Sequence, residues 1–238
     1  MTLYSENLTL PRTTDWDRYY DRPLATAKLT RRYTAHWLRA AIQKYSDRRS
    51  PLSVIEFGGG NSCFFRSLVE TLPIARYEIA DLNEKSLQLF EQQASQVPSV
   101  GTAAYRVNLL TDTPPLGLAD VVFSVGLVEH FNLEGTREVI QRHFSCVKEG
   151  GIVIITAPTP TWLYRMTRSA AEQIGVWQFP DERPLLADEM LRAAGGLGTL
   201  LRSSTLWPLV LTQQALILRA NNVRAQPKKL EAGFPLGR

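Results

Sequence analysis

Residues 52–62 read LSVIEFGGGNS, an apolar run that ends around Glu56 and is followed by three glycines and Asn-Ser. This order predicts a strand, a tight turn and the N-terminus of a helix. Glycines permit positive φ angles and let a ligand approach the main chain, and the first N–H groups of the helix face such a ligand. At the end of a parallel strand, this turn is typical of a nucleotide or nucleoside cofactor site. The alternative is a flexible turn that binds nothing.

A second acidic residue follows at the spacing expected for a ribose ligand. Tyr77-Glu78-Ile79-Ala80-Asp81 has the pattern of a short strand, and its final carboxylate comes about twenty residues after the glycines. A carboxylate can accept hydrogen bonds from two vicinal hydroxyl groups. Asp81 could instead only cap the helix expected over residues 86–93, but the paired spacing favours the ribose interpretation.

Apolar runs and helical segments alternate along the rest of the 238-residue chain. Further strands are expected at residues 104–109, 119–126 and 152–156. This alternation predicts an α/β fold, with a sheet covered by helices on both faces. The length suits a single domain with one sizeable core.

In this order, the motifs resemble the class I S-adenosylmethionine-dependent methyltransferases. Glu56-Phe57-Gly58-Gly59-Gly60 is similar to the E-x-G-x-G motif of that family, which often has a further glycine where this chain has Ser62. Leu127-Val128-Glu129-His130 is similar to the LEH segment of the ubiquinone and small-molecule branch. The dinucleotide fingerprint would instead require a third glycine at the position of Cys63.

The resemblance implies a Rossmann-like fold with a mostly parallel seven-stranded sheet, and S-adenosyl-L-methionine as the cofactor. It implies cofactor contacts at the ends of the first four strands, from Glu56, Gly58, Gly59, Gly60, Asp81, Leu82, Asn108, Leu109 and Ser124. Many relatives have an Asp where this chain has Asn108, and an Asn carbonyl can accept the same hydrogen bond from the adenine amino group.

The expected organisation has three parts: an N-terminal helical cap at residues 1–50, the methyltransferase domain at 51–222 and a flexible tail at 223–238. In the family such a cap often brings a Tyr to the edge of the cofactor, a role open to Tyr19 or Tyr20, although ordinary packing is the alternative. A substrate-side insert is expected at about residues 158–184. Its aromatic residues could form a substrate wall or an ordinary core: Trp162, Tyr164, Trp177 and Phe179.

The expected activity is methylation of an oxygen or nitrogen atom of a small-molecule acceptor. His130 is the candidate general base, because it follows the fourth strand and has a suitable intrinsic pKa; a structural hydrogen bond is the alternative role. Some relatives bind a metal through E-x-x-E-H, but Gly126 replaces the first Glu, so no metal is expected at Glu129 and His130.

Two other classes of function remain open. One is a nicotinamide-dependent dehydrogenase, disfavoured because the chain has Cys63 in place of a glycine and lacks a Tyr-x-x-x-Lys pair. The other is a non-catalytic methyltransferase-like partner protein. The intact Glu56, Gly58, Gly60 and Asp81 favour retained cofactor binding but do not establish turnover.

Composition adds few constraints. Much of the net charge of +4 comes from local groups of basic residues. Aromatic residues are not interleaved with them, so nucleic-acid binding is not expected. No apolar stretch reaches membrane-spanning length. Two cysteines without metal-site spacing, Cys63 and Cys146, favour a reducing compartment, and the cytoplasm is the expected location. The oligomeric state is not predicted.

Overall fold

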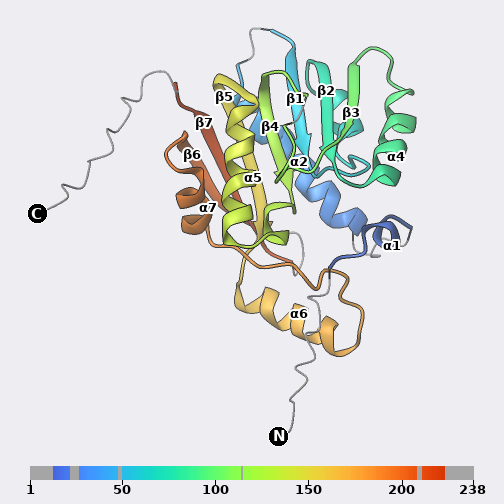
Figure 1. The fold of residues 1–238 in the computed structure, drawn as a ribbon, viewed down its shortest axis with the longest axis vertical. Helices are drawn as coiled ribbons and strands as arrows, with labels where there is room; N and C mark the ends of the chain where they lie inside the picture. The colour runs from blue at the N-terminus through green and yellow to red at the C-terminus, as the bar shows by residue number, and fades with distance from the viewer. Residues whose placement is uncertain (1–12, 22–26, 48–49, 114, 208–210, 223–238) are drawn as a thin grey trace, which may run out of the picture.

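A computed structural model describes residues 13–21, 27–47, 50–113, 115–207 and 211–222 (Figure 1). The start of the predicted cap, residues 1–12, and the predicted tail, residues 223–238, lie outside the described residues. In the part of the chain that the structure describes, no helix is long and apolar enough to cross a membrane.

A seven-stranded sheet forms the centre, with the order β3-β2-β1-β4-β5-β7-β6. β7 is antiparallel to both of its neighbours, and the pairs formed among the first five strands are parallel. This arrangement confirms the predicted mostly parallel sheet. The strands are β1 (Leu52–Phe57), β2 (Ile74–Asp81), β3 (Gly101–Arg106), β4 (Ala119–Val125), β5 (Val147–Pro158), β6 (Gly198–Leu206) and β7 (Gln213–Ala220).

Chain order reverses at β1, which pairs with β2 on one side and with β4 on the other. Such a switch point opens a crevice at the carboxyl ends of the strands. β3 begins and ends earlier than the predicted 104–109, so Asn108 and Leu109 lie in the loop after the strand and not within it. Both residues thereby reach the crevice.

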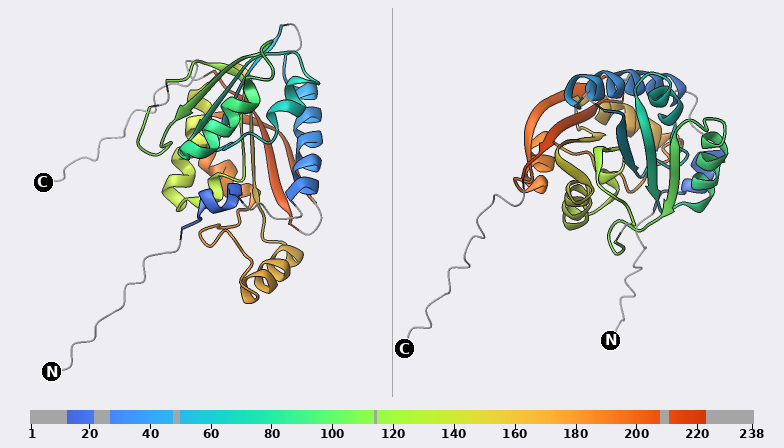
Figure 2. Two further views of the ribbon diagram at one scale, coloured as in Figure 1. Left: turned by 90° about the vertical axis from the view of Figure 1, so that its right-hand side faces the viewer. Right: turned by 90° about the horizontal axis from the view of Figure 1, so that it is seen from above.

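Helices cover both faces of the sheet, as predicted (Figure 2). α2 (Ala27–Tyr45), α3 (Phe65–Val69) and α4 (Glu84–Ala94) pack on one face, and α5 (Leu133–Ser145) and α7 (Ala187–Ala194) pack on the other. Alternate strand residues supply the two cores: Val54 contributes to the α2 side and Ile55 to the α5 side. Leu38 and Ile42 of α2 are fully buried in the first of these cores, so this helix belongs to the body of the domain.

Two short elements lie at the carboxyl-terminal end of the parallel strands. α1 (Trp16–Asp21) and α6 (Trp162–Gln173) are both at this end of the molecule in Figure 1. The 3₁₀ helix η1 (Val128–His130) follows β4 at the same end. The segments from the N-terminal region and from the predicted insert therefore meet above the switch point.

Candidate active site

Two cavities adjoin at the carboxyl ends of β1, β2 and β4. The larger cavity has a volume of about 470 Å³ and the smaller cavity about 200 Å³. Five residues line both cavities and so mark the boundary between them: Trp16, Tyr20, Gly58, Gly126 and His130. The structure thus joins the glycine loop, η1 and α1 in one site.

The glycine loop is braced from below by Glu56. The Tyr77 hydroxyl donates to Glu56 Oε2 at 2.5 Å, and the Ser62 hydroxyl donates to the same oxygen. A Cβ at Gly59 would lie 2.4 Å from Glu56 Cδ, so this close approach requires glycine. Burial raises the pKa of Glu56 to about 7, although both hydrogen bonds act in the opposite direction.

Asp81 links the glycine loop to the start of α4. Its Oδ2 accepts from the Gly60 N–H at 2.8 Å, and its Oδ1 accepts from the Asn83 N–H at 2.8 Å. The N-cap of α4 is Asn83, whose side chain accepts from Ser86 N–H, so Asp81 is not the cap. Asp81 lines the larger cavity, and a carboxylate has about four acceptor positions in all. Burial raises the pKa of Asp81, and its hydrogen bonds from main-chain N–H groups counteract the rise.

The other predicted cofactor residues divide into two groups. Leu82, Asn108 and Leu109 line the larger cavity. The Asn108 side-chain oxygen also accepts from the Leu110 N–H at 3.0 Å, which leaves it one acceptor position. Ser124 is fully buried and lines neither cavity; its hydroxyl lies 3.0 Å from Nε2 of His143. The Ser124 side chain points to the α5 side of the sheet, away from both cavities, and its predicted contact with the cofactor stays a prediction.

Tyr20 of α1 covers the loop. Its hydroxyl oxygen would be 1.6 Å from a Cβ at Gly60, so Tyr20 occupies the space that any side chain at position 60 would need. Gly58 and Gly59 line the cavities, whereas Gly60 is not among the lining residues and contacts Asp81 instead. Of the two candidate tyrosines, Tyr20 lines both cavities and Tyr19 lines the smaller one.

His130 lies between the two cavities and is held by Asp181. Its Nδ1 is 3.1 Å from Asp181 Oδ1, and its ring contacts the Trp16 ring edge-to-face at 5.0 Å. Burial lowers the pKa of His130, and Asp181 acts against that change. Burial alone would raise the pKa of Asp181, but hydrogen bonds from Thr14 and from His130 lower it. An ionised Asp181 must accept, so Nδ1 of neutral His130 carries the proton and Nε2 keeps its lone pair.

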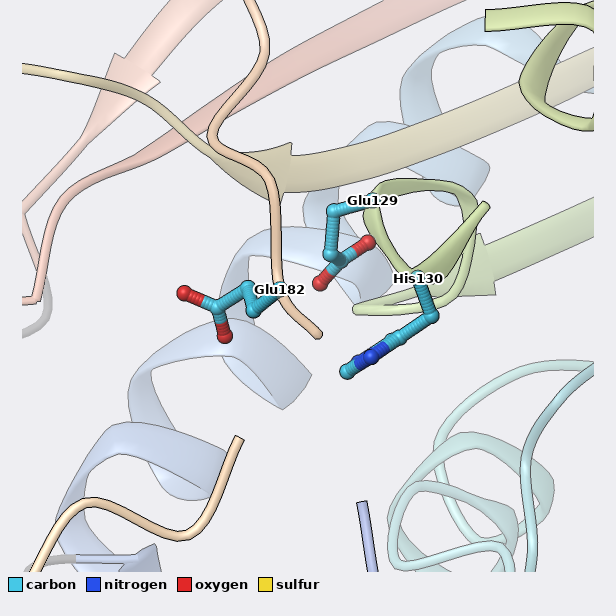
Figure 3. Close-up of side chains that lie close together, drawn as sticks. All are labelled: Glu129, His130 and Glu182. Atoms are coloured by element: carbon cyan, nitrogen blue, oxygen red, sulfur yellow. The ribbon is translucent and has the colours of Figure 1, made fainter. Parts of the chain in front are cut away.

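Two buried glutamates accompany His130 in the smaller cavity. Figure 3 shows Glu129 next to His130 on η1 and Glu182 on a neighbouring segment. One ligand atom from each of the three residues lies within 4.8 Å of the other two, so the cluster could accept a cation. Oε2 of Glu129 is buried and has no hydrogen-bond partner within the described residues.

Sequence reasoning missed Asp181 and Glu182. Both lie more than fifty residues after η1, in a segment without a recognised motif, and only the fold brings them to His130. Of the four aromatic residues proposed for a substrate wall, three line the smaller cavity: Tyr164, Trp177 and Phe179. Trp162 is 68% exposed and does not line it.

Comparison with known proteins identifies related sequences and folds. A family model described as methyltransferase domain matches residues 30–205, which is most of the chain. None of the curated proteins compared with the chain matches it.

Solved structures resemble the chain at low sequence identity. Magnesium protoporphyrin IX methyltransferase from Synechocystis PCC 6803 with bound SAH has a TM-score of 0.69 and 15% identity, over 87% of this chain and 93% of that one. The 1,6-didemethyltoxoflavin-N1-methyltransferase from Burkholderia thailandensis has a TM-score of 0.64 and 15% identity, over 87% and 85%. N-methyltransferase NodS from Bradyrhizobium japonicum WM9, in complex with S-adenosyl-L-homocysteine, has a TM-score of 0.59 and 12% identity, over 86% and 91%. At sequence identities this low, the TM-scores show that the chain shares a fold with these proteins.

Burial of Glu56 should make stability depend on pH in a definite direction. Because its folded pKa of about 7 exceeds the ordinary value, the folded state binds the proton more tightly, and this contribution to stability is lost as pH rises from about 4.5 to 7. Relative to Glu56→Gln, the wild-type free energy of unfolding should fall by about 3 kcal/mol across that range. Urea unfolding at several pH values measures the difference.

Glu70→Gln provides the control, because this variant removes a carboxyl that is 61% exposed. Its pH profile should match that of the wild type. A constant difference between wild type and Glu56→Gln from pH 4.5 to 7.5 would contradict the assignment.

Proposed function

The chain belongs to the methyltransferase-domain family and is an S-adenosylmethionine-dependent methyltransferase, and we propose that it methylates an oxygen or nitrogen atom of a small-molecule acceptor. The observation that carries this proposal is the pair of cavities that adjoin at Gly58, Gly126 and His130. One cavity suits an adenosyl group, and the other suits the acceptor at the reacting methyl. The structural neighbours named for a porphyrin and for a toxoflavin precursor support small-molecule chemistry.

The residues of the larger cavity fit the adenosyl part of the cofactor. Asp81 supplies acceptors for two ribose hydroxyls, and apolar side chains bound the space for the adenine ring: Leu82, Val107, Leu109 and Phe131. A Cβ at Gly58 would lie 2.5 Å from Leu127 Cδ1, so the loop has no room for side chains there. When bound, S-adenosylmethionine supplies an electrophilic methyl group on a positively charged sulfur.

His130 has the properties of a general base toward the acceptor. It is neutral, its Nδ1–H is held by Asp181, and it lines both cavities. The free Nε2 lone pair can take a proton from an acceptor in the smaller cavity. The surrounding aromatic rings exclude water and orient the nucleophile, which is the larger part of what methyl transfer requires from a protein.

We also propose a cytoplasmic location, supported by the free thiols of Cys63 and Cys146. Cell fractionation with an antibody against the chain tests this location, and recovery outside the cytoplasm would contradict it.

Asp81→Ala should weaken binding of S-adenosylmethionine at least tenfold. The variant removes two hydrogen-bond acceptors for the ribose, and each charge-assisted bond is worth about 1.5–3 kcal/mol. Isothermal titration calorimetry measures the affinity, and circular dichroism checks the fold. Asp188→Ala removes an exposed carboxylate from α7 and should bind normally; an unchanged affinity in folded Asp81→Ala would contradict the ribose assignment.

His130→Ala should reduce turnover by about 10²–10⁴-fold and leave cofactor affinity nearly intact, because proton transfer is typically worth that much. The wild-type rate should rise with pH through the lowered imidazole pKa and then level off, since only the neutral ring accepts a proton. Release of S-adenosylhomocysteine measures the rate. Near-normal turnover of the variant would show that His130 is structural.

Methyl transfer should not require a metal ion. Position 126 is a glycine, and the Arg168 guanidinium already lies 3.9 Å from Glu182 Oε1, which accepts from the Tyr164 hydroxyl. The rate should therefore be the same in EDTA as in magnesium. Activity that is lost on chelation and restored by a divalent ion would overturn this prediction.

A further inference from the structure

Glu129 is placed at the smaller cavity without a partner for one of its oxygens. The residue is 1% exposed and lines the cavity, and Oε2 accepts no hydrogen bond from the described residues. Leaving a buried acceptor unpaired is costly, and the cost is greater when the group is charged. A ligand that donates to this oxygen would remove the cost.

Glu182 faces the same space from the segment before α7. It is 9% exposed, lines the smaller cavity and is close enough for one oxygen to lie within 4.8 Å of an oxygen of Glu129 and a nitrogen of His130. Burial, and then the charge of Glu182, raises the pKa of Glu129 well above its ordinary value. Burial likewise raises the pKa of Glu182 to about 7. Each carboxyl therefore holds a proton more tightly than usual, and the Arg168 guanidinium, 3.9 Å from Glu182 Oε1, favours the ionised form of Glu182.

The three groups lie close enough together to surround a primary ammonium. Such a group has three N–H bonds at tetrahedral angles, so acceptors at about 2.9 Å from the nitrogen are separated from one another by about 4.7 Å. In the cluster, one oxygen from each glutamate and a nitrogen of His130 lie within 4.8 Å of one another.

Aromatic rings complete the surroundings of the carboxyls. Trp16 contacts Phe179 with centroids 6.1 Å apart, Phe179 contacts Trp177 at 5.9 Å, and Trp177 contacts Tyr164 at 6.3 Å. All four rings line the smaller cavity. Ring faces attract organic cations and bury an apolar body, whereas a hydrated metal ion gains little from such a wall.

We propose that the acceptor is an organic amine, bound as an ammonium whose nitrogen lies between Glu129, Glu182 and His130, with its apolar part against Trp16, Trp177 and Phe179. This inference rests on the proposed function and narrows it from oxygen or nitrogen to nitrogen. Glu129 and Glu182 are then residues that determine specificity, and their charge offsets that of the ammonium.

The chemistry balances with the groups present. One N–H proton passes to Nε2 of neutral His130, which becomes imidazolium beside Asp181 and later releases the proton to water. The freed nitrogen lone pair forms the new N–C bond with the methyl carbon. The C–S bond breaks, and its electron pair stays on the sulfur of the product S-adenosylhomocysteine. The methylated nitrogen leaves as a secondary ammonium.

The test compares amines with alcohols of the same shape on the full-length protein saturated with S-adenosylhomocysteine. Butylamine, benzylamine and 2-phenylethylamine are each paired with the corresponding alcohol, and binding is measured by calorimetry and by thermal shift. At least one amine should bind tenfold or more tightly than its alcohol, which corresponds to one charge-assisted hydrogen bond. Equal behaviour within every pair, including no binding by any member, would overturn the proposal.

Matched variants assign the preference to the cluster. Glu129→Gln and Glu182→Gln should reduce the amine preference at least tenfold while the affinity for S-adenosylhomocysteine stays unchanged. Glu149→Gln, which alters an exposed glutamate remote from the cavities, should retain the full preference. An amine preference that survives both cluster variants would also overturn the proposal.

Two further outcomes distinguish a failure of the amine proposal from a failure of the proposed methyltransferase function. A protein that fails to bind S-adenosylhomocysteine would refute the proposed function itself, before any amine is added. After EDTA treatment, magnesium, manganese and zinc are each added alone. A thermal shift with one of these ions that Glu129→Gln abolishes, without any amine preference, would show a metal site in place of the amine site.

Discussion

The site depends on a carboxyl group buried under the glycine loop. Glu56 has 1% of its surface exposed, and its partners are the hydroxyls of Ser62 and Tyr77. Gly59 passes so close above it that a side chain there would collide with the carboxyl carbon. The Glu56 carboxyl therefore fixes the path of the glycine loop from within the domain, although a carboxyl is an unfavourable group to bury there. Replacing water by two hydroxyl donors makes that burial tolerable.

Around this centre, the site is assembled from segments that are distant in sequence. β1 and β2 supply the glycine loop and Asp81, η1 supplies Glu129 and His130, and the segment before α7 supplies Asp181 and Glu182. The parallel strands bring the first two together, because their carboxyl ends meet at one edge of the sheet. The later segment is held by side-chain contacts, such as Arg168 Nη1 with the Glu182 carbonyl at 2.8 Å.

Residues placed by the strands could be predicted from the sequence, whereas residues placed by distant side-chain contacts could not. The strands and the glycine turn have local patterns, so the α/β class, the glycine turn at Gly58 and the position of Asp81 could be predicted from residue periodicity and spacing. The seven-stranded methyltransferase fold and the role of Glu56 were implied by the resemblance to the family. Asp181 and Glu182 have no such pattern, because their roles arise from a contact across about fifty residues of chain. Ser124 lies within the fourth strand, where the alternation of side chains turns its hydroxyl toward His143 on the α5 side of the sheet. The third strand ends earlier in the structure than predicted, so Asn108 lies in a loop, where its side-chain oxygen accepts from the Leu110 N–H.

Asp181 joins the segment before α1 to the 3₁₀ helix η1. Its carboxylate accepts from the main-chain N–H of Thr14 at 3.2 Å and from the Thr14 hydroxyl, and it also receives Nδ1–H of His130 at 3.1 Å. Thr14 precedes α1, the helix that covers the glycine loop. The Asp181 carboxylate therefore binds both the segment that leads into α1 and the His130 imidazole. Removing the Asp181 carboxylate would therefore act at two places at once, because the Thr14 donors and the His130 imidazole would lose the same acceptor.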